Sequence, residues 1–393
     1  MEKLDYPEGP TALSKALNAP DILLMGPGPT NCPERVLRCM SLPNLAPLDP
    51  ALCQIMDEIK DGLRYLFQTK NELTLVVSAS GHGGMDAVIS NLIEPGEVAL
   101  VDTSGFWGFR AADMSKRYGA TVYEIQAPLG THLTAAELED ALKKYRPKVF
   151  FTTHGDSSTG VVFNLDGIGD LCHKYDCLIA VDTVASLGGA PLFTDRWALD
   201  AVYSGSQKVL ASPAGLAPIT FSPKAQTKIL SRKTPCPVYY WDMSMLGDYW
   251  ACYGRPRIYH HTACSNLLYA LRESLAIVIE EGLPQMWARH KKVSQKLQHG
   301  LEELGFKLVV QNPEQRLPNV TTLWIPEGVN WIKACDWIME RYNIEIRGGL
   351  GRTMGKVFRI GLLGPNAYEE NVDKVLQVFP QGVKNGMSEN GSK

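Results

Sequence analysis

Two short stretches of the sequence place groups of opposite charge where an α/β enzyme could use them. The apolar run 178–181 stops on Asp182, and a second run, 200–204, is closely followed by Lys208. Apolar runs of this length predict buried parallel strands, and open α/β sheets bind ligands at the carboxyl ends of such strands. The sequence therefore predicts a carboxylate and an amine side by side at one edge of a sheet.

An amine and a carboxylate in this arrangement suit pyridoxal phosphate. The lysine would form a Schiff base, and the carboxylate would pair with the pyridine nitrogen so that the ring accepts electrons from a substrate carbanion. We predict these roles for Lys208 and Asp182. The approach Ser204-Gly-Ser-Gln207 is small and polar, as a loop close to a bulky ligand requires. The alternative is an ordinary strand end and a solvated surface lysine.

A glycine-rich turn follows an earlier predicted strand, 73–78. It reads Ala79-Ser-Gly-His-Gly-Gly84 and leads into a predicted helix. Free backbone N–H groups and the positive end of the helix dipole make such a junction an anion site. Ser80, Gly81 and His82 are therefore candidate phosphate contacts. The alternative is a turn that needs glycine only for tight packing.

Two further strand ends carry groups suited to a phosphorylated aromatic ring. Trp107 follows the predicted strand 98–102, where its indole could stack on a planar cofactor. Ser157 follows the predicted strand 149–153, where its hydroxyl could bond a phenolic oxygen. The alternatives are a core tryptophan and a polar turn capped by Asp156.

Further residues that could bind the substrate or the phosphate lie outside these strand ends. Arg359 lies in the predicted strand 357–360, from which a guanidinium could hold a substrate carboxylate by two parallel hydrogen bonds, unless it is a surface arginine in an ion pair. Gly26, in the stiff turn 25–30, allows close backbone approach and could border a pocket. Tyr259 and Thr262 are candidate phosphate donors.

No metal site is predicted. The pair His260 and His261 has no carboxylate or further histidine at ligand spacing, and the nine cysteines are scattered without zinc spacing. Such cysteines are typical of thiols in a reducing compartment.

From residue 72 onward, predicted strands alternate with predicted helices, and these elements must position the groups described above. The predicted strands are 73–78, 98–102, 122–125, 149–153 and 178–182, and the predicted helices between them are 83–92, 108–118, 134–145 and 165–175. This alternation predicts right-handed crossovers and a mostly parallel sheet, of the seven-stranded type, covered by helices. The fold class is therefore α/β.

The chain changes character after two long predicted helices, 266–281 and 285–304. Beyond them, predicted strands and helices mix without regular alternation; the strands are 306–310, 320–325, 344–347 and 357–360, and the helices are 331–342 and 368–378. We expect an N-terminal arm (1–22), a large cofactor-binding domain (23–283), a small α+β domain (284–381) and a flexible tail (382–393).

The bulk composition agrees with a soluble enzyme that acts on small molecules. The chain has 393 residues, 45% hydrophobic and 21% charged, with a formal net charge of −3. Such a balance provides no field for gathering nucleic acid or an anionic membrane. Residues 1–20 contain no apolar segment typical of a signal peptide or a membrane span.

Taken together, the motifs closely resemble those of the alanine:glyoxylate (serine:pyruvate) aminotransferases, which are fold-type I, class-V pyridoxal-phosphate enzymes. The resemblance runs from about residue 26 to 378. Three stretches carry it: Tyr203-Ser-Gly-Ser-Gln-Lys208, Val181-Asp-Thr-Val-Ala-Ser-Leu-Gly-Gly189 and Lys356-Val-Phe-Arg-Ile-Gly-Leu-Leu-Gly364. It implies ping-pong transamination from L-alanine to glyoxylate, which yields pyruvate and glycine.

The resemblance also implies a role for each matching residue. Lys208 would be the Schiff-base lysine and Asp182 the partner of the pyridine nitrogen, with Trp107 stacked on the ring, Ser157 at its hydroxyl side and Arg359 on the substrate carboxylate. Members of the family are homodimers with shared active sites. The phosphate would accordingly be held by residues of both subunits: Ser80, Gly81, His82 and Gln207 of one, and Tyr259 and Thr262 of the other.

Several alternatives stay open at this point. Arg352 stands where the family commonly has proline, near the carboxylate site, and this leaves the amino donor open among alanine, serine and 3-hydroxykynurenine. A lyase or desulfurase would need a reactive loop cysteine, which is not evident, and a non-catalytic binding protein would not need Lys208 and Asp182. The resemblance implies a peroxisome, with the cytoplasm as alternative, because the sequence stops at Ser392-Lys393, one residue short of a Ser-Lys-Leu signal.

Overall fold

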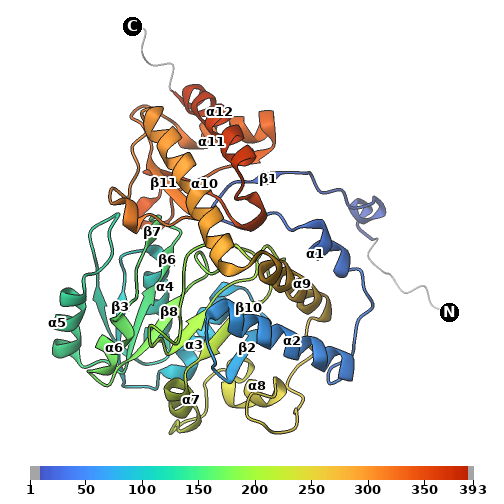
Figure 1. Cartoon of the computed structure of the whole chain (residues 1–393), viewed down its shortest axis with the longest axis vertical. Helices are drawn as coiled ribbons and strands as arrows, with labels where there is room; N and C mark the ends of the chain where they lie inside the picture. Colours follow the sequence, from blue (N-terminus) through green and yellow to red (C-terminus); the bar gives the residue numbers. More distant parts are fainter. Residues whose placement is uncertain (1–8, 388–393) are drawn as a thin grey trace, which may run out of the picture.

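The computed structural model describes residues 9–387, which form a large α/β domain and a smaller domain stacked against one end of it (Figure 1). Each domain has its own hydrophobic core. The larger core surrounds the central sheet, and the smaller core includes Leu297, Phe358 and Phe379. The packing therefore contains two separate cores.

A seven-stranded sheet forms the centre of the large domain. Its strands, in spatial order, are β2 (Leu73–Val77), β10 (Ala217–Phe221), β9 (Ala201–Tyr203), β8 (Leu178–Asp182), β5 (Val149–Thr153), β3 (Val98–Asp102) and β4 (Thr121–Ile125). Only β10 is antiparallel to its neighbours. The predicted mostly parallel α/β sheet is confirmed, and the carboxyl ends of the other six strands face the same edge. The sequence did not predict β10, whose short apolar run stands outside the regular alternation.

Helices connect and cover the strands as the alternation predicts. They are α3 (Gly81–Leu92), α4 (Phe106–Arg117), α5 (Ala135–Tyr145) and α6 (Ile168–His173), with α9 (Ser265–Glu281) as the last helix of the domain. Local signals fix their ends: the Thr134 side chain and Glu137 form a capping box at the start of α5. The sequence did not predict four other helices: α1 (Glu34–Cys39), α2 (Pro50–Phe67), α7 (Pro223–Leu230) and α8 (Met243–Tyr249).

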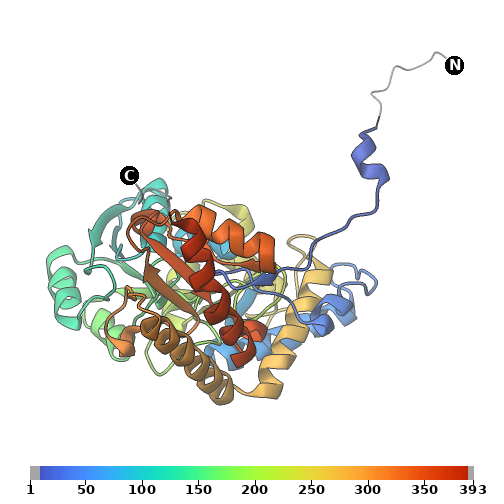
Figure 2. The ribbon, with the colours of Figure 1, turned by 90° about the horizontal axis from the view of Figure 1, so that it is seen from above.

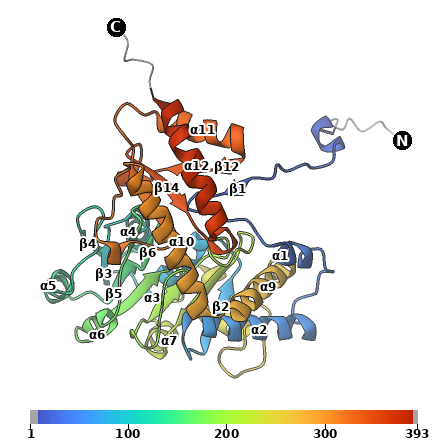
Figure 3. The ribbon, with the colours of Figure 1, turned by 45° about the horizontal axis from the view of Figure 1, so that its top comes forward.

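The small domain packs helices on an antiparallel sheet. Helix α10 (Leu283–Glu303) leads into it, and the sheet order is β11 (Val320–Trp324), β14 (Val357–Gly361), β13 (Arg347–Gly348). Helices α11 (Trp331–Tyr342) and α12 (Glu369–Gly386) complete it, with α10 and α12 side by side (Figure 3).

A two-stranded hairpin, β6 (Gly155–Asp156) with β7 (Val161–Val162), belongs to the large domain. No helix among residues 9–387 is long and apolar enough to cross a bilayer.

Three predictions in the small domain were wrong in detail. The expected strand 306–310 is irregular, because Leu308 makes only an isolated bridge to Leu323. The expected strand 344–347 is divided between β12 (Ile344–Glu345) and β13, which belong to different sheets. Helix α12 continues to Gly386, into the segment expected to be a flexible tail, because Phe379 and Val383 extend its buried stripe. The rest of that tail, including Ser392 and Lys393, lies outside the described residues.

Residues 23–25 belong structurally to the small domain. Strand β1 (Leu23–Leu24) pairs with β12, and Met25 lies in the small-domain core, although the sequence placed residues from 23 onward in the large domain. Residues 9–22 extend away from both domains (Figure 2), and Leu13 and Leu17 are 81% and 97% exposed. The turn 25–30 therefore crosses from one domain to the other.

Candidate active site

Eight of the predicted site residues line one small cavity at the carboxyl edge of the sheet, with a volume of about 90 Å³. They are Ser80, Gly81, His82, Trp107, Ser157, Asp182, Gln207 and Lys208. Met85, Gly155, Val184 and Ala185 also line this cavity and were not singled out from the sequence. Parallel strands bring residues from distant parts of the chain together here, as expected for their shared edge.

Asp182 ends β8 and is buried, with both carboxylate oxygens engaged. Oδ1 accepts a hydrogen bond from the Val184 N–H at 2.8 Å, and Oδ2 accepts one from the Tyr203 hydroxyl at 2.5 Å. Burial raises the pKa of Asp182 to about 6, against the opposing effect of these hydrogen bonds. A buried carboxylate that is still ionised at neutral pH therefore faces the cavity. The role of Tyr203 was missed, although its position one strand over from Asp182 was visible in the sequence.

The Lys208 amine lies in the loop after β9, against the turn that joins the domains. Its Nζ donates a hydrogen bond to the Pro27 carbonyl at 2.6 Å. Burial and, to a lesser extent, the Arg359 charge lower the pKa of Lys208 to about 8, against the opposing effects of Asp182 and Glu345. A Cβ on Gly28, whose φ is +108°, would lie 2.4 Å from Nζ. The second glycine of the Gly-Pro-Gly-Pro turn is thus required for the lysine to fit.

The start of α3 presents unpaired backbone donors to the cavity. Gly83 and Gly84 donate to the Ser80 carbonyl at 2.8 and 3.3 Å. Among the described residues, the N–H groups of Gly81 and His82 have no acceptor, and the Ser80 side chain does not cap the helix. The N–H groups and the helix dipole favour an anion at this point. The junction is therefore suited to a phosphate, as predicted.

Trp107 is held in a fixed orientation at the side of the cavity. Its Nε1 donates to the Ser157 hydroxyl at 3.1 Å, and its ring meets His82 edge to face with centroids 5.4 Å apart. The Ser157 hydroxyl accepts this bond and keeps its own proton to donate. Both residues thus lie where a planar ring with a phenolic oxygen could use them.

Arg359 approaches the cavity from the small domain; it does not line the cavity but contacts Ser157, which does. The expected alternative of a surface ion pair is wrong. Arg359 lies in β14 and is only 8% exposed. Its Nε donates to the Gly348 carbonyl at 2.7 Å and its Nη1 to the Ser157 carbonyl at 3.1 Å. No carboxylate pairs with it within residues 9–387. Burial lowers the pKa of Arg359 to about 10, against the opposing effect of the Asp156 charge, so the side chain is still a cation at neutral pH.

The other predicted positions lie outside this cavity. Gly26 packs against the small domain, where an added Cβ would lie 3.2 Å from Glu345 Oε2. Tyr259 and Thr262 are exposed, with 3.3 Å between their hydroxyl oxygens. Arg352 is also exposed, and its Nη1 donates to the Ser104 carbonyl at 3.3 Å. One chain thus does not bring Tyr259 or Thr262 to the cavity.

The residues present fit pyridoxal phosphate. The α3 terminus offers unpaired N–H donors for a phosphate, and the buried side-chain oxygen of Gln207 has no hydrogen-bond partner among residues 9–387. Asp182 supplies the carboxylate for a pyridine nitrogen, and Lys208 supplies an amine for the aldehyde. None of the described residues forms a cluster of side chains able to hold a metal ion.

Comparisons with known proteins show the family to which the chain belongs. Residues 23–375 match the family Aminotransferase class-V. An alanine–glyoxylate aminotransferase of Drosophila melanogaster is 50% identical, with 95% of each chain covered. The solved structure of an alanine–glyoxylate aminotransferase from Nostoc sp. superposes with a TM-score of 0.91 at 43% identity, covering 94% of this chain and 97% of that one. A ureidoglycine–glyoxylate aminotransferase structure from Bacillus subtilis gives 0.91 at 35% identity, covering 96% and 97%. With its matching fold and its lysine and aspartate at the edge of the sheet, the chain belongs to the class-V aminotransferase family.

Proposed function

We propose that this pyridoxal-phosphate-dependent aminotransferase transfers the amino group of L-alanine to glyoxylate and yields pyruvate and glycine. The observation that carries the proposal is the single cavity lined by the Lys208 amine, the Asp182 carboxylate and the start of α3. Glyoxylate appears in the names of all three relatives compared above, which supports it as the acceptor.

The residues of the chain have separable parts in this reaction. Pyridoxal phosphate, when bound, supplies an electron sink for the carbanion formed at the substrate Cα. The Lys208 amine, with a pKa near 8, is partly neutral at pH 7 to 8 and can take the Cα proton and return it. The Asp182 carboxylate keeps the proton on the pyridine nitrogen, and Arg359 holds the substrate carboxylate.

The names of the relatives support alanine as the amino donor. Two of the three relatives compared above are alanine–glyoxylate aminotransferases. L-Serine is close to alanine in size and is the second donor to compare, and 3-hydroxykynurenine is the bulkier alternative.

The test is a half-reaction followed by visible absorbance. L-Alanine added without acceptor should bleach the band of the lysine-bound cofactor, and glyoxylate should restore it. L-Serine and 3-hydroxykynurenine, added in parallel at equal concentration, rank the donors. Bleaching by 3-hydroxykynurenine but not by alanine would refute the proposed donor, and a protein that shows no band after supply of pyridoxal phosphate would refute the enzyme assignment.

We also propose a homodimer in which Tyr259 and Thr262 complete the phosphate site of the partner. Both side chains are exposed and lie outside the cavity of their own chain, as a trans contribution requires. A phosphate held from two chains would explain why hydroxyl donors stand on the surface. Localisation in the peroxisome stays a prediction from the family resemblance.

Hybrid dimers test the shared site. Co-expression of a Lys208→Ala chain with a Tyr259→Ala chain gives a hybrid in which one site is intact if Tyr259 acts in trans. Activity at limiting cofactor should then rise to about half of the wild-type value per dimer, since one of two sites works. Activity no greater than the sum of the two parents would place Tyr259 in its own site or in none.

A further inference from the structure

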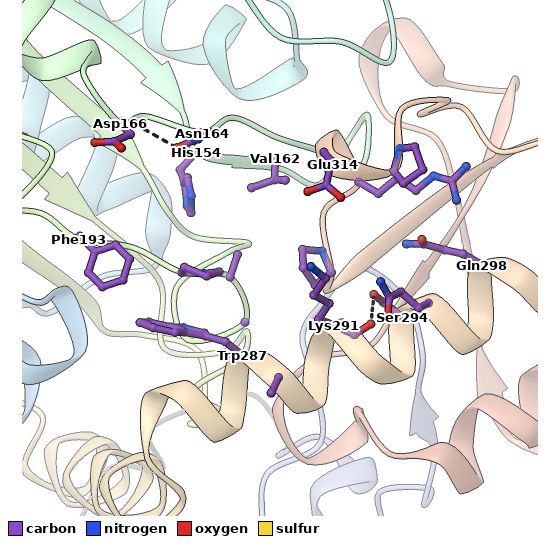
Figure 4. Close-up of a pocket in the computed structure, with 18 of the residues that line it drawn as sticks. His154, Val162, Asn164, Asp166, Phe193, Trp287, Lys291, Ser294, Gln298 and Glu314 are labelled. Carbon is purple, nitrogen blue, oxygen red and sulfur yellow. Dashed lines mark hydrogen bonds between the residues drawn. The ribbon is translucent and has the colours of Figure 1, made fainter.

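A second and larger cavity lies between the two domains, next to the candidate active site, with a volume of about 590 Å³ (Figure 4). Cavities that bind drug-sized ligands fall in this range. Helix α10 forms one wall; loops that follow β5 and β8, together with the segment 313–318 before β11, form the others. His154 lines this cavity whereas Ser157, three residues later, lines the candidate active site. No residue lines both.

The α10 wall presents an ordered series of side chains. Trp287, Lys291, Ser294 and Gln298 are spaced by four, three and four residues, so they share one face of the helix. Figure 4 shows them following one another along α10 towards the cavity. A ligand lying along this face would meet an aromatic ring, then an ammonium group, then a hydroxyl and an amide.

The end of the cavity near Trp287 is aromatic. Phe193 meets Trp197 and Trp287 edge to face, with centroids 5.5 Å apart in both pairs and interplanar angles of 81° and 72°. Aromatic rings prefer such edge-to-face or offset contacts to direct face-to-face stacking. This end is therefore suited to a planar aromatic ring.

The charges further along select a single negative charge. Three Lys and Arg side chains line this cavity. Arg316 is paired with Glu302 at 2.8 Å, and the Arg196 guanidinium lies over the Phe193 ring, 5.7 Å from its centroid. Lys291 has neither an ion pair nor a ring contact of this kind in the part of the chain that the structure describes. Asp166 and Glu314 stand across the cavity from α10 (Figure 4) and would repel a ligand of high negative charge. A ligand with one carboxylate can pair with Lys291 and carries too little negative charge to be repelled strongly by Asp166 and Glu314.

We propose that this cavity is a binding site for a small aromatic monocarboxylate. Its ring lies against Phe193 and Trp287, and its carboxylate pairs with the Lys291 ammonium one helical turn away. The site is distinct from the one for the transaminated substrate, and the proposal does not depend on which amino donor the enzyme uses.

The test is calorimetric titration of the full-chain holoenzyme with indole-3-acetate and with its uncharged analogue, indole-3-acetamide. The acid should bind about threefold more tightly than the amide, the ratio expected for a solvent-accessible ion pair. Lys291→Gln should abolish this preference. Lys292→Gln is the matched control, because Lys292 is on the same helix but pairs with Glu369 and does not line the cavity.

A blocking variant separates this cavity from the active site. Ala288 is exposed on α10 and lines the cavity, so Ala288→Trp should weaken indole-3-acetate binding at least about tenfold while transaminase kcat/KM is unchanged. The proposal is overturned if neither probe binds at millimolar concentration, or if Ala288→Trp leaves binding intact, which would place the probe at Arg359 or elsewhere. An acid preference that survives Lys291→Gln would also overturn it.

Discussion

Replacing Tyr203 by phenylalanine isolates the group that keeps Asp182 ionised. The Tyr203 hydroxyl donates to Asp182 Oδ2 at 2.5 Å, both side chains are buried, and this bond holds the carboxyl pKa down against the effect of burial. The phenylalanine ring would keep the packing of the tyrosine, because only the hydroxyl is removed. The change therefore acts on one hydrogen bond.

The expected magnitude follows from that bond. A hydrogen bond to a charged group contributes about 1.5 to 3 kcal/mol, and about 1.4 kcal/mol corresponds to one pH unit, so Tyr203→Phe should raise the Asp182 pKa by about one to two pH units. From a pKa of about 6, the ionised fraction at pH 7 would fall from roughly 90% to roughly half or below. Because the ionised carboxylate is the form that binds the protonated pyridine nitrogen, the acid limb of activity should move to higher pH.

The assay is the pH profile of kcat/KM for both enzymes, with the cofactor dissociation constant measured across the same range. Tyr118→Phe is the matched control, because its hydroxyl donates to Asp86 at 2.7 Å, away from the cavity, and should cost about 1 kcal/mol of unfolding free energy without moving the profile. An acid limb at the same pH in Tyr203→Phe and wild type would refute the assigned role. So would an equal displacement in Tyr118→Phe.

Three further predictions test the surroundings of Lys208. Gly28→Ala should destabilise the fold by about 1 to 3 kcal/mol or more and weaken cofactor retention, because the backbone has a positive φ and the added Cβ would meet Lys208 Nζ. Gly254→Ala is the control in chemical denaturation: Gly254 also has a positive φ but has no atom within 4 Å of the Cβ position, so this variant measures the backbone strain alone. Arg359→Lys should raise KM for the amino donor about 10- to 100-fold, since one ammonium cannot replace two parallel guanidinium bonds, and an unchanged KM would remove Arg359 from substrate binding. In the cofactor-free protein, the rate of recombination with pyridoxal phosphate, measured by stopped flow, should rise with pH through about 8, because the Lys208 amine loses its proton there. Arg359→Gln removes a charge that lowers the pKa of Lys208, so this variant should show the rise at higher pH.

Much of the candidate site was visible in the sequence because strand ends are local features. Apolar runs that stop on Asp182 or lead to Lys208 mark both the strand and its carboxyl edge, and the glycine-rich turn at Ser80 marks the start of a helix. The resemblance then added a role for Gln207. To predict that these residues line one cavity, it was enough to know that their strands are parallel; the order of the strands in the sheet was not required.

Other features had no local signal. The antiparallel strand β10 lies between β2 and β9, and a five-residue apolar run does not indicate with which strands it pairs. Gly28 and Tyr203 were parts of recognised motifs, but nothing in their neighbours indicated that one gives space to Lys208 and the other donates to Asp182. The burial of Arg359 likewise could not be distinguished from an exposed strand position.

The sequence by itself therefore determined the α/β class, the strand ends and the chemical groups that they carry, since the periodicity of apolar residues records burial within each element. Only the tertiary structure decided the contacts between the domains. Lys208 meets the Pro27 carbonyl across 181 residues of chain, and Arg359 meets the Ser157 carbonyl across 202. Such contacts depend on how two cores pack together, and backbone carbonyls, which every residue carries, leave no mark in the sequence.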